Sequence, residues 1–202
     1  MFDRLTTDWQ GKTVILIGGG PSLRTFNFLR LKRQRMNGVI VVAINDAVKR
    51  APFSNVVISI DSLWLGRRFH VLRAFRGEKI AVVDGSRTIF RPGIRYFVRS
   101  QEARLSEDMG VICAGENSGF AALGMSLMRG ASKIFMLGFD MNGPGHFHAG
   151  YEWKCPHGVA DYPRWVGYFP VLAEAAAKQG TSIINCNPDS AVRCFPFGSI
   201  DA

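Results

Sequence analysis

The sequence predicts an α/β protein: an open, mostly parallel, Rossmann-like sheet with helices on both faces, in a single domain over residues 1–202. Short apolar segments rich in β-branched residues recur along the chain, and amphipathic stretches separate them. The first apolar segment runs directly into three consecutive glycines. A chain of 202 residues, 47% hydrophobic and 20% charged, is typical of one globular domain with a sizeable core.

Each predicted strand is apolar on both faces, which is typical of a parallel sheet that helices cover on both sides. The predicted strands are 13–17, 39–44, 55–60, 79–83, 133–137 and 181–185, with a further candidate strand at 94–98. The predicted helices are 22–36, 61–75, 117–129 and 165–179. Because strands and helices alternate, we expect right-handed crossovers between parallel strands.

The net charge of +9 is unevenly distributed along the chain. Residues 1–105 hold 19 Lys and Arg against 7 Asp and Glu, whereas residues 106–202 hold 6 against 9. A basic half either favours anionic partners, such as nucleotides, phosphosugars or nucleic acid, or only makes the surface soluble. Its arginines are candidates to hold a diphosphate or an anionic acceptor. If 94–98 is a strand, Arg95 and Arg99 share one of its faces.

The cellular location is predicted from what the sequence lacks. Its longest apolar runs are shorter than the ~20 residues that cross a bilayer, so we expect no membrane span. The first twelve residues include acids and do not resemble a secretory signal. The widely scattered cysteines, which are predicted to be free thiols, are Cys113, Cys155, Cys186 and Cys194. These features predict a cytoplasmic protein.

The glycine turn, residues 18–22, joins the first predicted strand to the first predicted helix. It consists of Gly18, Gly19, Gly20, Pro21 and Ser22. Glycines let an anion approach the backbone, and the N-terminus of a helix offers unpaired N–H groups and the positive end of a dipole. Pro21 suits a first helical turn, and Ser22 either caps the helix or contacts the ligand. Because Leu23 stands where a dinucleotide motif has its third glycine, and no Lys-Ser/Thr pair follows, the turn is neither that motif nor a Walker A loop. It predicts a phosphate site, the alternative being a tight turn without ligand.

Polar residues follow two other predicted strands. Asn45 comes directly after the second strand, and Asp61 after the third. In open α/β sheets, ligands bind outside the carboxyl ends of the strands, near a topological switch point. Asn45 is suited to hydrogen bonds with a base or ribose, and Asp61 to a ribose hydroxyl or a metal. The alternative for each is a helix N-cap.

Four segments occur in an order that is familiar from one superfamily. They are "GGGPSL" (18–23), "AIND" (43–46), "ENSGFAALGMSLMRGASKIFMLGFDM" (116–141) and "NCNPDSAV" (185–192). Together they resemble bacterial lipooligosaccharide sialyltransferases, which transfer sialic acid from CMP-sialic acid. They are also similar to MptE-like proteins, whose archaeal members are hydroxymethylpterin diphosphokinases that use ATP. Phage-borne proteins of undefined function share the motif set.

The resemblance implies that these segments surround a donor nucleotide, with "CNPDS" at the base-binding end and Asp140 at a strand terminus facing the site. With Asp61 included, the predicted nucleotide-binding residues are Gly18, Gly19, Gly20, Pro21, Ser22, Asn45, Asp61, Asn117, Ser118, Gly119, Asp140, Asn187 and Ser190. From the residues alone, Asn117 or Ser118 can also cap the next helix, and Gly119 allows close backbone approach.

The sequence departs from the sialyltransferase pattern at two positions. The segment 114–116 reads Ala-Gly-Glu where the sialyltransferases have an arginine. The segment 162–165 reads Tyr-Pro-Arg-Trp where they have their catalytic histidine.

A long segment, 139–163, is predicted to be a loop that closes over substrate, because Gly143, Gly145 and Pro144 suit a mobile lid. It carries three histidines, His146, His148 and His157, which are the predicted catalytic residues. Together with Cys155 they form a pattern that could alternatively hold a transition metal, although the spacing matches no established zinc motif.

The sequence therefore predicts a nucleotide-dependent transferase, with glycosyl transfer from a CMP-sugar-like donor as the first hypothesis. The first alternative is an ATP-dependent pyrophosphokinase in which Asp61 and Asp140 hold Mg²⁺. The second is a non-catalytic protein that binds a nucleotide or nucleic acid. The expected partner is a nucleotide or nucleotide sugar.

Overall fold

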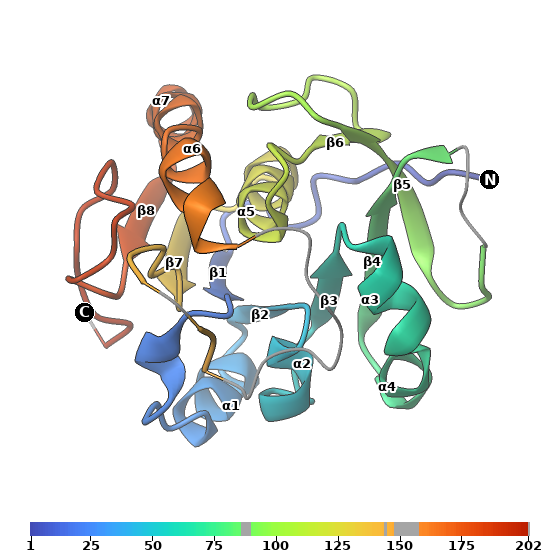
Figure 1. Ribbon diagram of the computed structural model, residues 1–202, viewed down its shortest axis with the longest axis horizontal. Coiled ribbons are helices and arrows are strands. Elements are labelled where there is room, and N and C mark those ends of the chain that lie inside the picture. Colours follow the sequence, from blue (N-terminus) through green and yellow to red (C-terminus); the bar gives the residue numbers. More distant parts are fainter. Residues whose placement is uncertain (86–89, 144, 148–157, 202) are drawn as a thin grey trace.

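The computed structural model describes residues 1–85, 90–143, 145–147 and 158–201. In this part, eight parallel strands form one sheet with the order β6-β5-β4-β3-β2-β1-β7-β8 (Figure 1). The strands are β1 (Thr13–Ile17), β2 (Ile40–Ile44), β3 (Val56–Ser59), β4 (Glu78–Val83), β5 (Arg95–Ser100), β6 (Val111–Cys113), β7 (Lys133–Leu137) and β8 (Ser182–Asn185). The predicted open parallel sheet is confirmed, and β5 confirms the candidate strand at 94–98.

Helices cover both faces of the sheet, as predicted. They are α1 (Leu29–Met36), α2 (Ala47–Arg50), α3 (Ser62–Arg67), α4 (Phe69–Ala74), α5 (Ser118–Met128), α6 (Tyr162–Val166) and α7 (Phe169–Gln179). Figure 1 shows α5, α6 and α7 on one face and α1 to α4 on the other. Successive side chains of β1 point to opposite faces, so Leu16 packs in the hydrophobic cluster under α5 and Ile17 in the cluster under α1.

Three predicted helices are interrupted in the structure. The stretch 22–36 is a short 3-10 turn, Pro21–Leu23, followed by α1, because the side-chain oxygen of Asn27 accepts a hydrogen bond from the Leu29 N–H (3.0 Å) and starts a new helix. The stretch 61–75 divides at Arg68, which leaves helical geometry at ψ 15°. The stretch 165–179 divides because Pro170 has no N–H with which to continue a helix.

The order of the strands places a topological switch point at β1. From β1 to β6 the chain adds strands in one direction only. It then crosses back through α5 and adds β7 on the other side of β1. A crevice therefore opens at the carboxyl ends of β1 and β7, where open α/β sheets bind their ligands.

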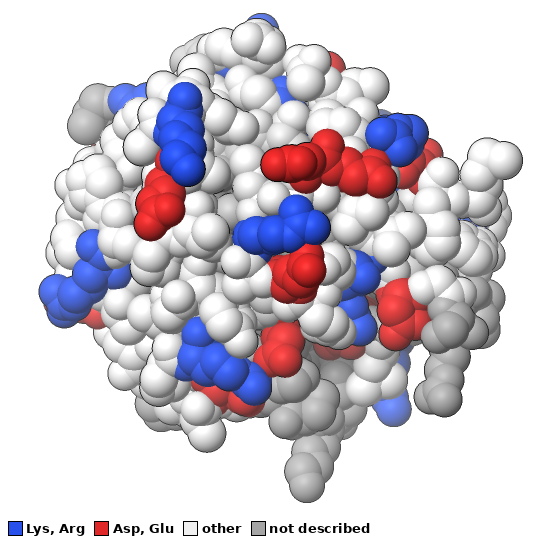
Figure 2. Space-filling model, turned by 90° about the horizontal axis from the view of Figure 1, so that it is seen from above, with Lys and Arg blue, Asp and Glu red and all other residues white. Residues whose placement is uncertain are grey.

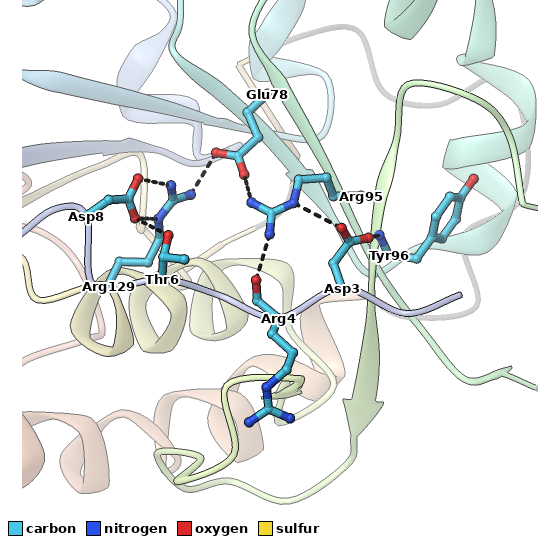
Figure 3. Close-up of polar contacts among 8 residues, drawn as sticks. All are labelled: Asp3, Arg4, Thr6, Asp8, Glu78, Arg95, Tyr96 and Arg129. Carbon is cyan, nitrogen blue, oxygen red and sulfur yellow. Dashed lines mark hydrogen bonds and ion pairs between the residues drawn. The ribbon is translucent and has the colours of Figure 1, made fainter.

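At the amino ends of the strands, which form the edge opposite the crevice, a network of charged residues joins neighbouring segments (Figure 3). Arg129, only 4% exposed, follows α5 and pairs with Asp8 at 2.6 Å and Glu78 at 2.7 Å. Glu78 also pairs with Arg95 at 2.5 Å. Burial disfavours the charged forms of Asp8 and Arg129, but their hydrogen bond and mutual attraction outweigh it. The pKa of Asp8 is therefore lowered and the pKa of Arg129 raised.

Three cysteines lie in the described part of the chain, and all three are free thiols, as predicted: Cys113, Cys186 and Cys194. Burial raises the pKa of the half-buried Cys186 to about 11. Cys155 lies outside the described residues. None of the described helices has the length and apolar character needed to span a membrane.

Candidate functional site

A cavity of about 690 Å³ lies along the carboxyl ends of the strands. It extends from the β1–β7 crevice, past the ends of β2 and β3, to the end of β5. This volume lies within the range of small-molecule sites. Ten of the predicted site residues line it: Gly19, Gly20, Pro21, Asn45, Asp61, Asn117, Ser118, Gly119, Asp140 and His146. Segments far apart in the sequence thus converge as expected.

The glycine turn is pressed against the segment that follows β7. The Gly18 N–H donates to the Leu137 carbonyl (2.7 Å), and the Gly20 N–H to the Gly138 carbonyl (2.8 Å). A Cβ on Gly18 would lie 2.6 Å from the Gly138 carbonyl oxygen, and a Cβ on Gly20 would overlap the Asp140 carboxylate. Gly18 and Gly20 are therefore required by the fold itself, while Gly19 and Gly20 line the cavity.

Asp140 closes the glycine turn from the other side of the crevice. Its side chain is buried, and Oδ2 accepts a hydrogen bond from the Ser22 N–H (2.9 Å). Its Oδ1 accepts a second bond from the Asn187 side-chain amide. The Ser190 hydroxyl donates to the Phe139 carbonyl (2.5 Å). Asn187 and Ser190 thus support Asp140 from behind and lie outside the cavity lining, as do Gly18 and Ser22.

Asn45 has the most distinctive geometry in the cavity. Its backbone is left-handed (φ 52°), and its Nδ2 lies 3.4 Å from the Ser118 hydroxyl oxygen. Its Oδ1 is buried without a hydrogen-bond partner among the described residues. A buried acceptor that lacks a partner costs free energy, so this oxygen is suited to a ligand donor.

Backbone strain is concentrated at the same place. Within the described ranges, three non-glycine residues have a positive φ: Asn45, Glu116 and Met141. All three line the cavity. Strained backbone is typical of functional sites, where the surrounding structure maintains it.

The N-terminus of α5 points its first turn at the cavity. Asn117 caps this helix, since its Oδ1 accepts from the Phe120 N–H (3.0 Å). A Cβ on Gly119 would lie 2.7 Å from the Phe139 ring, so close packing requires glycine there. The N–H groups of Ser118 and Gly119 have no partner within the helix, and the positive end of its dipole favours an anion.

Asp61 caps a helix at the wall of the cavity. Its Oδ1 accepts from the Trp64 N–H (3.0 Å), so it caps α3. It also lines the cavity beside the end of β3. The capping role is confirmed, and the ligand role stays a prediction.

His146 is the predicted catalytic histidine that the structure describes. The next residue, Phe147, donates its N–H to the Gly19 carbonyl (3.0 Å), and the Arg24 guanidinium reaches the His146 carbonyl (3.3 Å). These bonds hold the imidazole over the glycine turn, where a Cβ on Gly19 would be 3.0 Å from its Nδ1. His148 and His157 lie outside the described residues. No group of three His, Cys, Asp or Glu in the described part could hold a metal.

Two charged residues of the cavity were not singled out as site residues from the sequence. Arg99 lies at its β5 end, where its Nη1 donates to the Ile60 carbonyl (3.2 Å). The prediction that Arg95 and Arg99 share a face of β5 holds, but they lie at opposite ends of this strand, so only Arg99 reaches the cavity. Glu116 also lines it and pairs with Arg164 at 2.6 Å. The one available signal for Arg99 was its position at the end of a candidate strand.

The fold and cavity define an open α/β protein of the Rossmann-like class with a cavity at its switch point. Among solved structures, the chain is similar to the MAf glycosyltransferase from Magnetospirillum magneticum AMB-1, with a TM-score of 0.64 and 11% sequence identity. The match covers 100% of this chain and 36% of that chain, so this chain spans about a third of the neighbour's length. The similarity shows a shared fold. No protein-family model and no curated protein matches the sequence.

Proposed function

We propose that the protein is a nucleotide-dependent transferase that transfers a glycosyl group from a CMP-sugar-like donor. The observation that carries this proposal is Asn45, a residue with strained backbone and an unpartnered side-chain oxygen that lines a cavity at the switch point of a parallel sheet. The structural neighbour's description as a glycosyltransferase supports the reaction class. The resemblance of the four sequence segments to sialyltransferases supports the donor type.

In the proposed complex, the base or ribose, a ribose hydroxyl and the phosphate of the donor each contact a different polar group of the cavity. Asn45 receives a hydrogen bond from the base or ribose, and Asp61 accepts one from a ribose hydroxyl. The phosphate lies at the first-turn N–H groups of Ser118 and Gly119, where the α5 dipole favours its charge. Asn187 and Ser190 act indirectly, by holding Asp140 and therefore the glycine turn in place.

Transfer requires a base for the acceptor and stabilisation of the leaving phosphate. In the proposed reaction, an acceptor hydroxyl attacks the anomeric carbon, and the bond from that carbon to the phosphate oxygen breaks. The electron pair leaves with the phosphate, whose charge the α5 N-terminus stabilises. The proton of the hydroxyl passes to a histidine, for which His146, held over the glycine turn, is the described candidate. His148 and His157 remain predicted candidates for the same step.

The pyrophosphokinase alternative fits the geometry less well. It requires Asp61 and Asp140 to hold Mg²⁺, but each of the two Asp140 carboxylate oxygens already accepts a hydrogen bond. A metal there would have to use the one lone pair left on either of these buried oxygens, beside the Ser22 N–H or the Asn187 amide. Among the described residues of the cavity, no feature specifically favours the non-catalytic alternative.

Thermal-shift measurements with CMP, CTP, ATP and a CMP-sugar, each with and without Mg²⁺, test the proposal. We expect cytidine nucleotides to raise the melting temperature without Mg²⁺. A shift with ATP and Mg²⁺ alone would favour the pyrophosphokinase alternative. The absence of a shift with every nucleotide would overturn both enzymatic hypotheses. Binding of CMP without turnover of CMP-sugars over a panel of sugar acceptors would favour the non-catalytic protein.

A further inference from the structure

One face of the molecule is strongly basic. Residues 21–76, which build α1 to α4, contain 11 Lys and Arg but only 2 Asp and no Glu. These helices cover one face of the sheet. Figure 2 shows that the face formed by α5 to α7 carries charges of both signs, interspersed with one another. The positive charge is thus concentrated on the α1–α4 face.

The two acids of this region do not neutralise its outer surface. Asp46 is buried, where it pairs with Lys49 (2.9 Å) and Arg68 (3.4 Å). Asp61 lines the cavity and caps α3. On α1, one cation, Arg30, pairs with Asp201. The other three, Lys32, Arg33 and Arg35, are exposed and have no ion pair within the described part of the chain.

The outer side of α1 also exposes two large apolar residues. Leu29 is 66% exposed and Met36 75%, whereas the only buried residue of this helix is Leu31. With Lys32 and Arg33 they occupy positions i, i+3, i+4 and i+7, which form one stripe along a helix. The two apolar residues therefore lie about 10 Å apart along the helix axis, one at each end of a pair of cations.

We propose that the α1–α4 face docks on the surface of an anionic lipid bilayer, with α1 lying flat against it. Lys32, Arg33 and Arg35 are attracted to anionic headgroups, while Leu29 and Met36 enter the boundary between headgroups and acyl chains. The phosphates of a nucleic acid would pair with the cations but would leave both apolar side chains exposed to water. A bilayer accommodates both kinds of side chain, so the stripe favours the bilayer. This contact is independent of the proposed chemistry in the cavity.

Co-sedimentation with vesicles tests the contact. The full chain is mixed with vesicles of 30% phosphatidylglycerol in phosphatidylcholine, with vesicles of phosphatidylcholine alone, and with duplex DNA at the same salt concentration. We expect binding to the anionic vesicles only, and weaker binding as salt is added. Since each basic residue near an anionic surface contributes about fivefold to partitioning, Lys32→Glu/Arg33→Glu is expected to lower it by more than about twentyfold.

Two further variants separate the parts of the surface. Leu29→Ser/Met36→Ser keeps every charge, and we expect it to lower vesicle binding while leaving the melting temperature unchanged, because both side chains are exposed. Lys178→Glu/Arg193→Glu makes the same change in net charge at exposed positions on α7 and after β8, and is expected to bind normally. Failure to bind anionic vesicles, equal loss in the control, no effect of the serine variant, or tighter binding to DNA would each overturn the proposal.

Discussion

Asp140 and Ser22 lie 118 positions apart in the sequence, yet the Asp140 carboxylate accepts a hydrogen bond from the Ser22 N–H at 2.9 Å. This bond joins the end of β7 to the glycine turn after β1, across the switch point of the sheet. The turn that appears in the sequence as a phosphate loop is therefore held by a carboxylate of the protein itself.

Replacing Asp140 with alanine is expected to destabilise the protein by about 1 to 3 kcal/mol, because it leaves the Ser22 N–H and the Asn187 amide without their buried acceptor. Urea unfolding measures the change. Asp189→Ala is the matched control, since its side chain is exposed and we expect no measurable change. Equal stability of Asp140→Ala and the unaltered protein would show that the bond does not hold the turn.

Gly20→Ala is expected to cost about 1 to 3 kcal/mol, since its Cβ would overlap Asp140 and lie 2.7 Å from the Gly138 carbonyl oxygen. Gly66→Ala in α3 is the control, because nothing lies within 4 Å of its Cβ and alanine favours a helix by up to about 1 kcal/mol. The two variants are compared by thermal unfolding. If both behave alike, close packing does not explain the glycine.

Asn45→Gly tests the ligand site without disturbing the backbone, since glycine adopts a φ of 52° freely. We expect the affinity for CMP to fall by about 10- to 100-fold, as loss of one or two hydrogen bonds predicts. The melting temperature of the free protein is expected to stay the same or rise, because the variant also removes the backbone strain and the unpartnered oxygen. Calorimetric titration measures the affinity. Ser132→Ala, which removes a hydrogen bond to the Lys12 carbonyl at the opposite edge, serves as the control. Unaltered CMP affinity in Asn45→Gly would remove Asn45 from the site.

Arg129→Ala is expected to destabilise the protein by about 1 to 3 kcal/mol, because Asp8 and Glu78 lose a buried hydrogen-bond donor and the Trp9 ring, whose centroid lies 4.0 Å from the guanidinium carbon, is uncovered. Arg104→Ala removes an exposed pair with Glu102, and we expect no measurable effect. Chemical denaturation distinguishes the two. A loss as small as that of the control would mean that the buried network contributes little.

Asp46 gives the stability a defined dependence on pH. Burial disfavours its charged form, but hydrogen bonds from Lys49 and Trp64, with the charges of Lys49 and Arg68, outweigh burial and lower its pKa below the ordinary 3.8. The contribution of the Asp46 carboxylate to the free energy of unfolding is therefore complete well above pH 3.8. It is lost as the pH falls through the lowered pKa that Asp46 has in the folded protein.

We expect Asp46→Asn to cost about 1 to 3 kcal/mol at pH 7, and the difference from the unaltered protein to shrink below pH 4. Unfolding curves at pH 7, 5 and 3 measure it. A difference that stays constant over this range would contradict the lowered pKa.

Most of the fold could be predicted from local patterns. The apolar segments at 13–17 and 133–137 coincide with β1 and β7, because strands buried on both faces leave a continuous apolar signal. The three-residue strand β6 and the single-turn helix α2 are too short to show a hydrophobic periodicity in the sequence. The interruption at Asn27 depends on a side-chain bond that periodicity does not register. Pro170, by contrast, is a local signal that the sequence carries and that periodicity alone overlooks.

The sequence by itself determined the parallel α/β class and the residues that gather at the carboxyl ends of the strands, because a parallel sheet brings those ends to one edge. Only the tertiary structure decided what each residue does there. It placed Asn187 and Ser190 behind Asp140, assigned Gly18 and Gly20 to packing against the segment after β7, and brought Arg99 into the cavity. These outcomes depend on contacts between segments more than a hundred residues apart, such as Ser22 and Asp140 at a separation of 118, and no local pattern of residues encodes such contacts.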